Sequence, residues 1–100
     1  MQRNDFVTKM NNIRENGTLM SEDGIRERIH EHADPEKDIP VCIGELSELI
    51  LELTRFQRGK MNMFDFLQEL SHVQWAVWSL QDRFSVSDET LRTAVQASFR

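Results

Sequence analysis

The sequence contains no apolar run long enough to span a membrane, and no charged segment followed by an apolar core of the kind found in signal peptides. It also has a single cysteine, Cys42, which cannot form a disulfide within the chain. The formal net charge of −5 leaves no strongly basic face for non-specific nucleic-acid binding. Together these absences predict a cytoplasmic protein that associates neither with membranes nor non-specifically with nucleic acid.

The sequence also has little of the apolar–polar alternation that β-strands require, so we expect an all-α fold. Apolar residues recur at helical intervals in residues 4–15, 40–58 and 63–83. Ser21 and Ser87 each precede two acidic residues. This combination predicts the start of a helix, because serine caps free backbone N–H groups and the acids lie at the positive end of the helix dipole.

A chain of 100 residues fits one domain, so we expect residues 1–100 to fold as a single helical bundle of about four helices. Residues 40–100 carry the clearest patterns and form its predicted helical core. Residues 1–39 form an N-terminal helical segment of unclear role. A chain this short buries only roughly 60–65% of its unfolded surface. We therefore expect dimerisation to complete the bundle.

The predicted helix at 63–83 supports association, because it is apolar on two sides. One arc contains Phe66, Leu70, Val73, Val77 and Leu80, and the other contains Phe64, Leu67, Trp75 and Trp78. A helix that is apolar on two sides is usually buried on two sides. Three other short helices do not easily cover both arcs, so the pattern predicts a homodimer or a tetramer.

Acidic residues with helical spacing lie beside the predicted core. Glu45 and Glu48 belong to the helix at 40–58 and Glu69 to the helix at 63–83. The apolar arc next to the first two acids contains Ile43, Leu46, Leu49, Ile50, Leu53 and Phe56. None of the three acids has a lysine or arginine three or four positions away, where helix neighbours meet. Of the acids in this region, Glu52 does have one, Arg55.

If the two helices pack side by side and antiparallel, Glu45, Glu48, Glu69 and His72 converge on one point. A divalent cation at that point would offset the repulsion, because hard cations bind carboxylate oxygens. The alternative is two ordinary solvated faces, since glutamate is common on helix surfaces. Spacing alone leaves both interpretations open.

The same residues resemble a family pattern. The MazG-like, all-α nucleoside triphosphate pyrophosphohydrolases carry Glu-x-x-Glu and, after a variable spacer, Glu-x-x-Asp on two neighbouring helices. Here "GELSEL" supplies Glu45 and Glu48, and "FLQELSHV" supplies Glu69. The segments "FQRGK" and "FSVSDETL" also resemble small, phage-type members. The resemblance covers about residues 40–100.

The resemblance implies a hydrolase that splits a nucleoside or deoxynucleoside triphosphate into the monophosphate and pyrophosphate. It implies magnesium as the cofactor, metal ligands at Glu45, Glu48, Glu69 and His72, and catalytic roles for Glu48 and Glu69. Family members form dimers or higher oligomers, in agreement with the two-sided helix.

One position departs from the family pattern, because His72 replaces the last acid. Imidazole suits manganese or zinc better than magnesium. The metal preference has therefore changed, or three acids and water hold the cation, or hydrolysis has been lost. Asp65, one turn before Glu69, is a carboxylate that could compensate. A catalytically inactive nucleotide-binding or protein-interaction module is the alternative function. A di-iron centre is another, since such bundles also use Glu-x-x-His.

Two further groups have both a functional and an ordinary explanation. Arg55, Arg58 and Lys60 end the helix at 40–58 and could contact phosphates, but basic residues there also match the helix dipole. Trp75 and Trp78 could stack on a base, but aromatic residues on an apolar helix more often belong to a core or an interface.

Overall fold

The computed structural model describes residues 3–17 and 19–100, and all regular secondary structure in these residues is helical. The described part contains five helices: α1 (Arg3–Asn16), α2 (Glu22–Glu31), α3 (Asp38–Gln57), α4 (Met63–Phe84) and α5 (Asp88–Ser98). The all-α prediction is confirmed, with five helices in place of about four. No helix in these residues combines the length and the apolar character needed to cross a membrane.

The helix starts follow local side-chain chemistry. Ser21 and Ser87 cap α2 and α5 as predicted, and their hydroxyls accept hydrogen bonds from the third residue along, at 3.0 and 3.1 Å. Asn62 caps α4 in the same way, accepting from Phe64 N at 2.9 Å. Helix α3 begins two residues before the predicted Pro40. Proline fits there, because the first turn leaves backbone N–H groups unpaired in any case.

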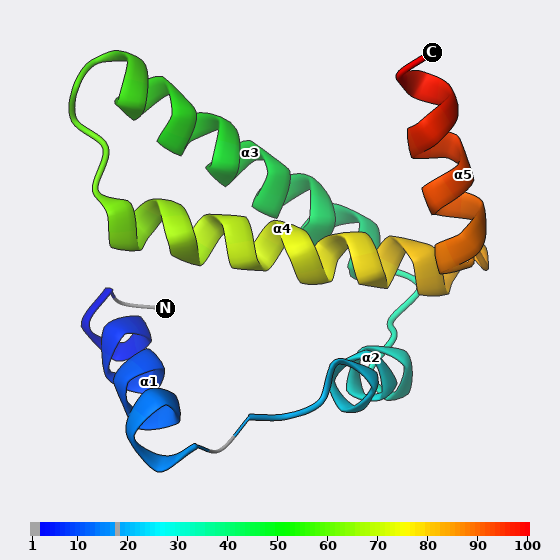
Figure 1. The fold of residues 1–100 in the computed structure, drawn as a ribbon, viewed down its shortest axis with the longest axis horizontal. Coiled ribbons are helices and arrows are strands. Elements are labelled where there is room, and N and C mark those ends of the chain that lie inside the picture. Colours follow the sequence, from blue (N-terminus) through cyan, green and yellow to red (C-terminus); the bar gives the residue numbers. More distant parts are fainter. Residues whose placement is uncertain (1–2, 18) are drawn as a thin grey trace.

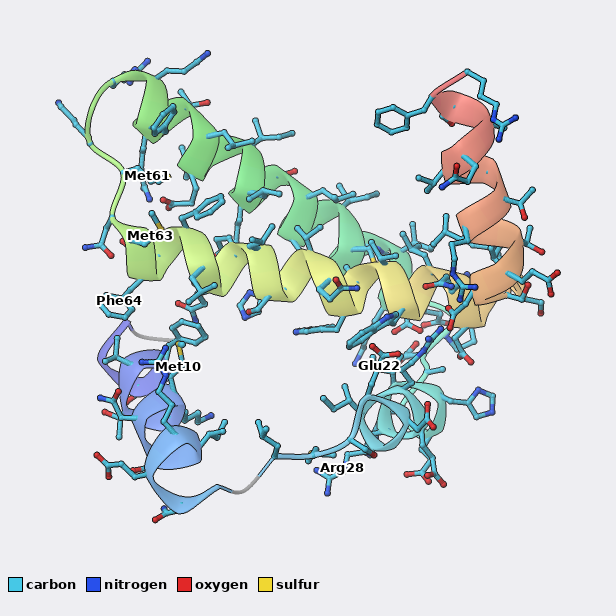
Figure 2. All side chains as sticks on the ribbon, viewed as in Figure 1. Met10, Glu22, Arg28, Met61, Met63 and Phe64 are labelled. Atoms are coloured by element: carbon cyan, nitrogen blue, oxygen red, sulfur yellow. The ribbon has the colours of Figure 1, made fainter. Side chains whose placement is uncertain are left out.

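Helices α3 and α4 form a long antiparallel hairpin on which the rest of the chain is arranged (Figure 1). Helices α1 and α2 lie against α4 near its two ends. Figure 2 shows Met10 and Phe64 in the space between α1 and the start of α4. Helix α5 leaves the end of α4 at a steep angle and packs along none of the other described helices.

Helix α5 is instead tied to the rest of the molecule at its first turn. Asp88 accepts two hydrogen bonds from the guanidinium of Arg26 in α2, at 2.9 and 3.0 Å, and one from Gln81 at 2.9 Å. Val95 of α5 and Phe99, the residue after α5, do not pack into a core. Both side chains are exposed, since no described helix covers this side of α5.

Helix α3 turns an unexpected face toward α4. Cys42 and Glu52 are each 4% exposed, and Glu45 is half-buried. Most of the predicted apolar arc is exposed: Ile43, Leu46, Ile50, Leu53 and Phe56. The prediction that this arc forms the core is wrong for the single chain, because the acids occupy the face toward α4.

The single chain consequently exposes more surface than its size requires. Its accessible surface is 7936 Å², about 2,000 Å² more than the roughly 5,900 Å² typical of a folded monomer of 11.8 kDa. Its radius of gyration is 15.5 Å, compared with about 13 Å for a compact domain of this length. Among the described residues, the buried hydrophobic core consists of Cys42 and Ala76.

Candidate metal centre

The α3–α4 hairpin brings four predicted site residues together. Antiparallel pairing puts the Glu45 turn of α3 beside the His72 turn of α4, and the Glu48 turn beside the Glu69 turn. Each of the four side chains offers one ligand atom, and these four atoms all lie within 4.8 Å of one another. Asp65, proposed above as a compensating carboxylate, is not part of this group. The donor set is three carboxylates and one imidazole.

Three atoms of this cluster are buried without a hydrogen-bond partner: Oε2 of Glu45, Oε2 of Glu69 and Nδ1 of His72. His72 Nδ1 lies 2.9 Å from Glu45 Oε2 and 3.6 Å from Glu69 Oε2. The first distance is that of an ion pair when the imidazole is protonated, but neither atom has a hydrogen-bond partner. Leaving each such atom unpaired costs about 1–3 kcal/mol. A bound cation would satisfy all three.

The burial of Glu69 beside other acids also shifts its pKa. Burial, together with a hydrogen bond and like charge from the neighbouring carboxyl of Glu48, raises the pKa of Glu69 to about 7. His72 acts in the opposite direction. A carboxyl group with this pKa is partly protonated at neutral pH. Cation binding would favour the ionised form and release a proton.

The cluster lines a pocket of about 370 Å³, a volume typical of small-molecule sites. The pocket is lined by Glu45, Glu48, Leu51, Glu52, Arg55, Gln68, Glu69 and His72. Of the three predicted phosphate-binding residues, only Arg55 is among them. Arg58 caps the C-terminus of α3 and Lys60 follows it, and both side chains are exposed away from this lining.

Glu52 was missed as a site residue. Its pairing with Arg55 was predicted, and Nη1 of Arg55 does donate to Oε1 of Glu52. The side chain of Glu52 is nevertheless only 5% exposed, and its Oε2 is buried without a hydrogen-bond partner. The signal was its position seven residues after Glu45, which places both acids on one helix face.

Gln68 was also missed, and it is 6% exposed in the wall of the same pocket. It precedes His72 by four residues, so the two side chains share a face of α4. On the other side of His72, the ring of Trp75 meets the imidazole edge to face, with centroids 5.7 Å apart. This contact helps to fix the orientation of the imidazole.

Comparison with known proteins identifies no relative for this chain: no family model, no curated protein and no solved structure matches it.

Proposed function

We propose that the chain is a divalent-metal-dependent pyrophosphohydrolase, which converts a nucleoside or deoxynucleoside triphosphate into the monophosphate and pyrophosphate. The sequence resemblance to MazG-like enzymes suggests this reaction. The observation that carries the proposal is the convergence of Glu45, Glu48, Glu69 and His72, with three buried and unpaired ligand atoms, in a pocket that also contains Arg55.

The donor set fits a hard divalent cation. Carboxylate oxygens suit magnesium, and the imidazole of His72 shifts the preference toward manganese. The unpaired atoms Glu45 Oε2, Glu69 Oε2 and His72 Nδ1 are the groups that such an ion would satisfy. A bound cation would offset phosphate charge and polarise the phosphoryl group.

The residues of the chain would have separate roles in the reaction. Glu48 and Glu69, whose carboxyl groups are close enough to share a hydrogen bond, would take up the proton of the attacking water. Arg55 would pair with phosphate oxygens, since guanidinium groups bind phosphate through charge-assisted hydrogen bonds. Buried Glu52 would hold the guanidinium of Arg55 at the wall of the pocket.

We further propose that the protein is a homodimer or a tetramer in the cytoplasm. A second copy would cover the exposed apolar face of α3, formed by Ile43, Leu46, Ile50, Leu53 and Phe56. If each chain of a dimer covered its surplus surface, the interface would bury about 4,000 Å² in total, within the range of obligate homodimers. The single cysteine and the nucleotide substrate agree with a cytoplasmic location.

The test is to incubate the protein with a panel of ribo- and deoxynucleoside triphosphates, with magnesium, manganese and zinc supplied separately. Chromatography should detect the monophosphate and pyrophosphate in equal amounts, and Glu48→Gln should abolish both. Metal-dependent stabilisation without turnover would favour the inactive binding module. Release of the diphosphate and inorganic phosphate would contradict the proposed reaction.

A further inference from the structure

A second pocket lies farther along the α3–α4 hairpin, where α2 covers it. Its volume is about 330 Å³, and its lining is mainly apolar. Ile25, Arg28 and Ile29 of α2 form one wall together with His32, the residue after α2. Trp75 and Ser79 of α4 form another wall, and Asp38 lies at the start of α3. The sequence gives no role to residues 1–39, but this pocket depends on them.

The second pocket and the metal centre share a stripe along α4. Gln68 and His72 line the metal centre, while Trp75 and Ser79 line the second pocket. These residues occupy positions i, i+4, i+7 and i+11, which lie on one face of a helix. The ring contact between His72 and Trp75 joins the two sites directly. The metal centre and the apolar pocket are therefore neighbours on the same side of the hairpin.

The distance between the two sites is similar to the length of a nucleotide. His72 and Ser79 are seven residues apart on α4, and Asp38 and Glu45 are seven residues apart on α3. Seven residues of helix span about 10 Å. This distance is similar to the separation between the phosphates and the base of an extended nucleotide. The hairpin thus offers an acidic, cation-binding end and an apolar, aromatic end at that distance.

Helix α2 is clamped in place, so the apolar pocket exists before any ligand arrives. Arg26 makes its two hydrogen bonds to Asp88, and its guanidinium lies 5.7 Å from the centroid of the Trp78 ring. One turn later, His30 Nδ1 lies 2.8 Å from Asp82 Oδ1. These contacts hold the wall formed by Ile25 and Ile29 against α4.

We propose that the α2-covered pocket binds the nucleoside part of the nucleotide, with the base stacked on Trp75. Aromatic rings stack on every base, and the apolar wall from α2 would exclude water from the opposite face. Asp38 and Ser79 supply polar atoms for the edge of the base. This inference rests on the proposed function and gives α2 the role of a base-binding element.

The test compares two probes on the full chain with manganese present: pyrophosphate, and a deoxynucleoside triphosphate with a methylene group between the α and β phosphorus atoms. Calorimetry should show that Trp75→Ala weakens binding of the nucleotide analogue roughly 10- to 100-fold. Pyrophosphate binding should weaken much less, because Trp75 meets the metal centre only through its ring contact with His72. Trp75→Phe should retain most of the affinity. Leu70→Ala, which removes an exposed apolar side chain outside both pockets, is the matched control.

Ile29→Gln, on the opposite wall, provides a second variant in case Trp75→Ala folds poorly, and it should show the same selective loss. Equal affinity of all variants for the analogue would overturn the inference while leaving the proposed function intact. A pocket variant that changes the oligomeric mass but shows no selective loss of affinity for the analogue would also overturn the inference, because a second copy would then occupy the pocket. Failure of pyrophosphate to bind the unmodified protein would overturn the proposed function and this inference together.

Discussion

The two faces of α3 reverse the usual relation between polarity and burial. The face toward α4 carries Glu45 and Glu52, and Glu52 is 4% exposed. The opposite face carries Ile43 and Ile50, which are 59% and 64% exposed. A helix placed only by its own hydrophobic burial would be rotated to put the apolar side inward. The difference predicts that α3 is positioned by something besides the burial of apolar surface within one chain.

Each face lowers the stability of the isolated chain, and each effect would be relieved by a binding partner. Buried carboxylates without partners are unfavourable unless a cation or proton compensates them. A large exposed apolar face is typical of a surface that another chain covers. We call the face of α3 that turns Glu45 and Glu52 toward α4 the inner face, and the face that carries Ile43 and Ile50 the outer face. We therefore predict that a cation stabilises the inner face and that a second copy stabilises the outer face.

The largest effect should come from placing charge on the outer face. Ile50→Asp combined with Leu53→Asp should convert the proposed dimer or tetramer into a monomer, because two carboxylates would have to be buried in the interface. Sedimentation at micromolar concentration should show the unmodified protein as at least a dimer and the variant as a monomer, a weakening of association of at least 100-fold.

Phe99→Asp is the matched control, because Phe99 is 89% exposed on α5, outside the apolar face of α3. It should leave the oligomeric mass unchanged. A stable monomer in the unmodified protein would mean that the outer face of α3 does not serve self-association.

A smaller effect is expected when the ligand set of the inner face is changed. His72→Asp adds a negative charge and an oxygen ligand, so magnesium affinity should rise by on the order of tenfold, while the preference for manganese should decrease. Calorimetric titration of both metals into both proteins at one fixed pH measures this. Equal magnesium affinity in the two proteins would place His72 outside the binding site.

The inner face also predicts an unusual pH dependence of stability in the metal-free protein. The pKa of Glu69 is about 7 in the folded chain and 4.5 in the reference state, so the folded protein binds more protons between these values. Stability should therefore fall as pH rises from 5 to 8, by roughly 1–3 kcal/mol. Urea unfolding across this range measures the trend.

Glu69→Gln should remove most of this pH dependence, whereas Glu89→Gln at the start of α5 should not. Stability that rises with pH in the metal-free protein would mean that Glu69 is ionised and already compensated. In that case the inner face would need no cation.

The smallest effect concerns the clamp that holds α2. Arg26 and Gln81 lower the pKa of Asp88 to about 2 through hydrogen bonds. The clamp therefore contributes stability above pH 3.8 and loses it as pH falls through about 2. Asp88→Asn should increase hydrogen exchange in α2 without changing the metal affinity. Unchanged exchange would show that the clamp does not hold α2.

The helices and the convergence of the four site residues could be predicted, because both depend on local periodicity and on one antiparallel connection. The orientation of α3 could not. A helical wheel shows where the apolar arc lies but not which neighbour covers it, and the described chain contains no helix that covers Ile50 or Phe56. The burial of Glu52 could not be predicted either, since it depends on the face that α3 turns toward α4. The clamp between Arg26 and Asp88 joins positions 62 residues apart, which no local pattern reveals.

If the converging side chains of Glu45, Glu48, Glu69 and His72 form a cation site, thermal unfolding with and without metal tests it most directly. Manganese at about 100 times its dissociation constant should stabilise the unmodified protein by roughly 2.7 kcal/mol, since the unfolded chain has no such site. For a domain of this size that is a rise in Tm on the order of 10 °C. Glu48→Gln should be at least as stable as the unmodified protein without metal, because it relieves repulsion, and should show no rise when metal is added. A full rise in Glu48→Gln, or no rise in the unmodified protein, would contradict the account.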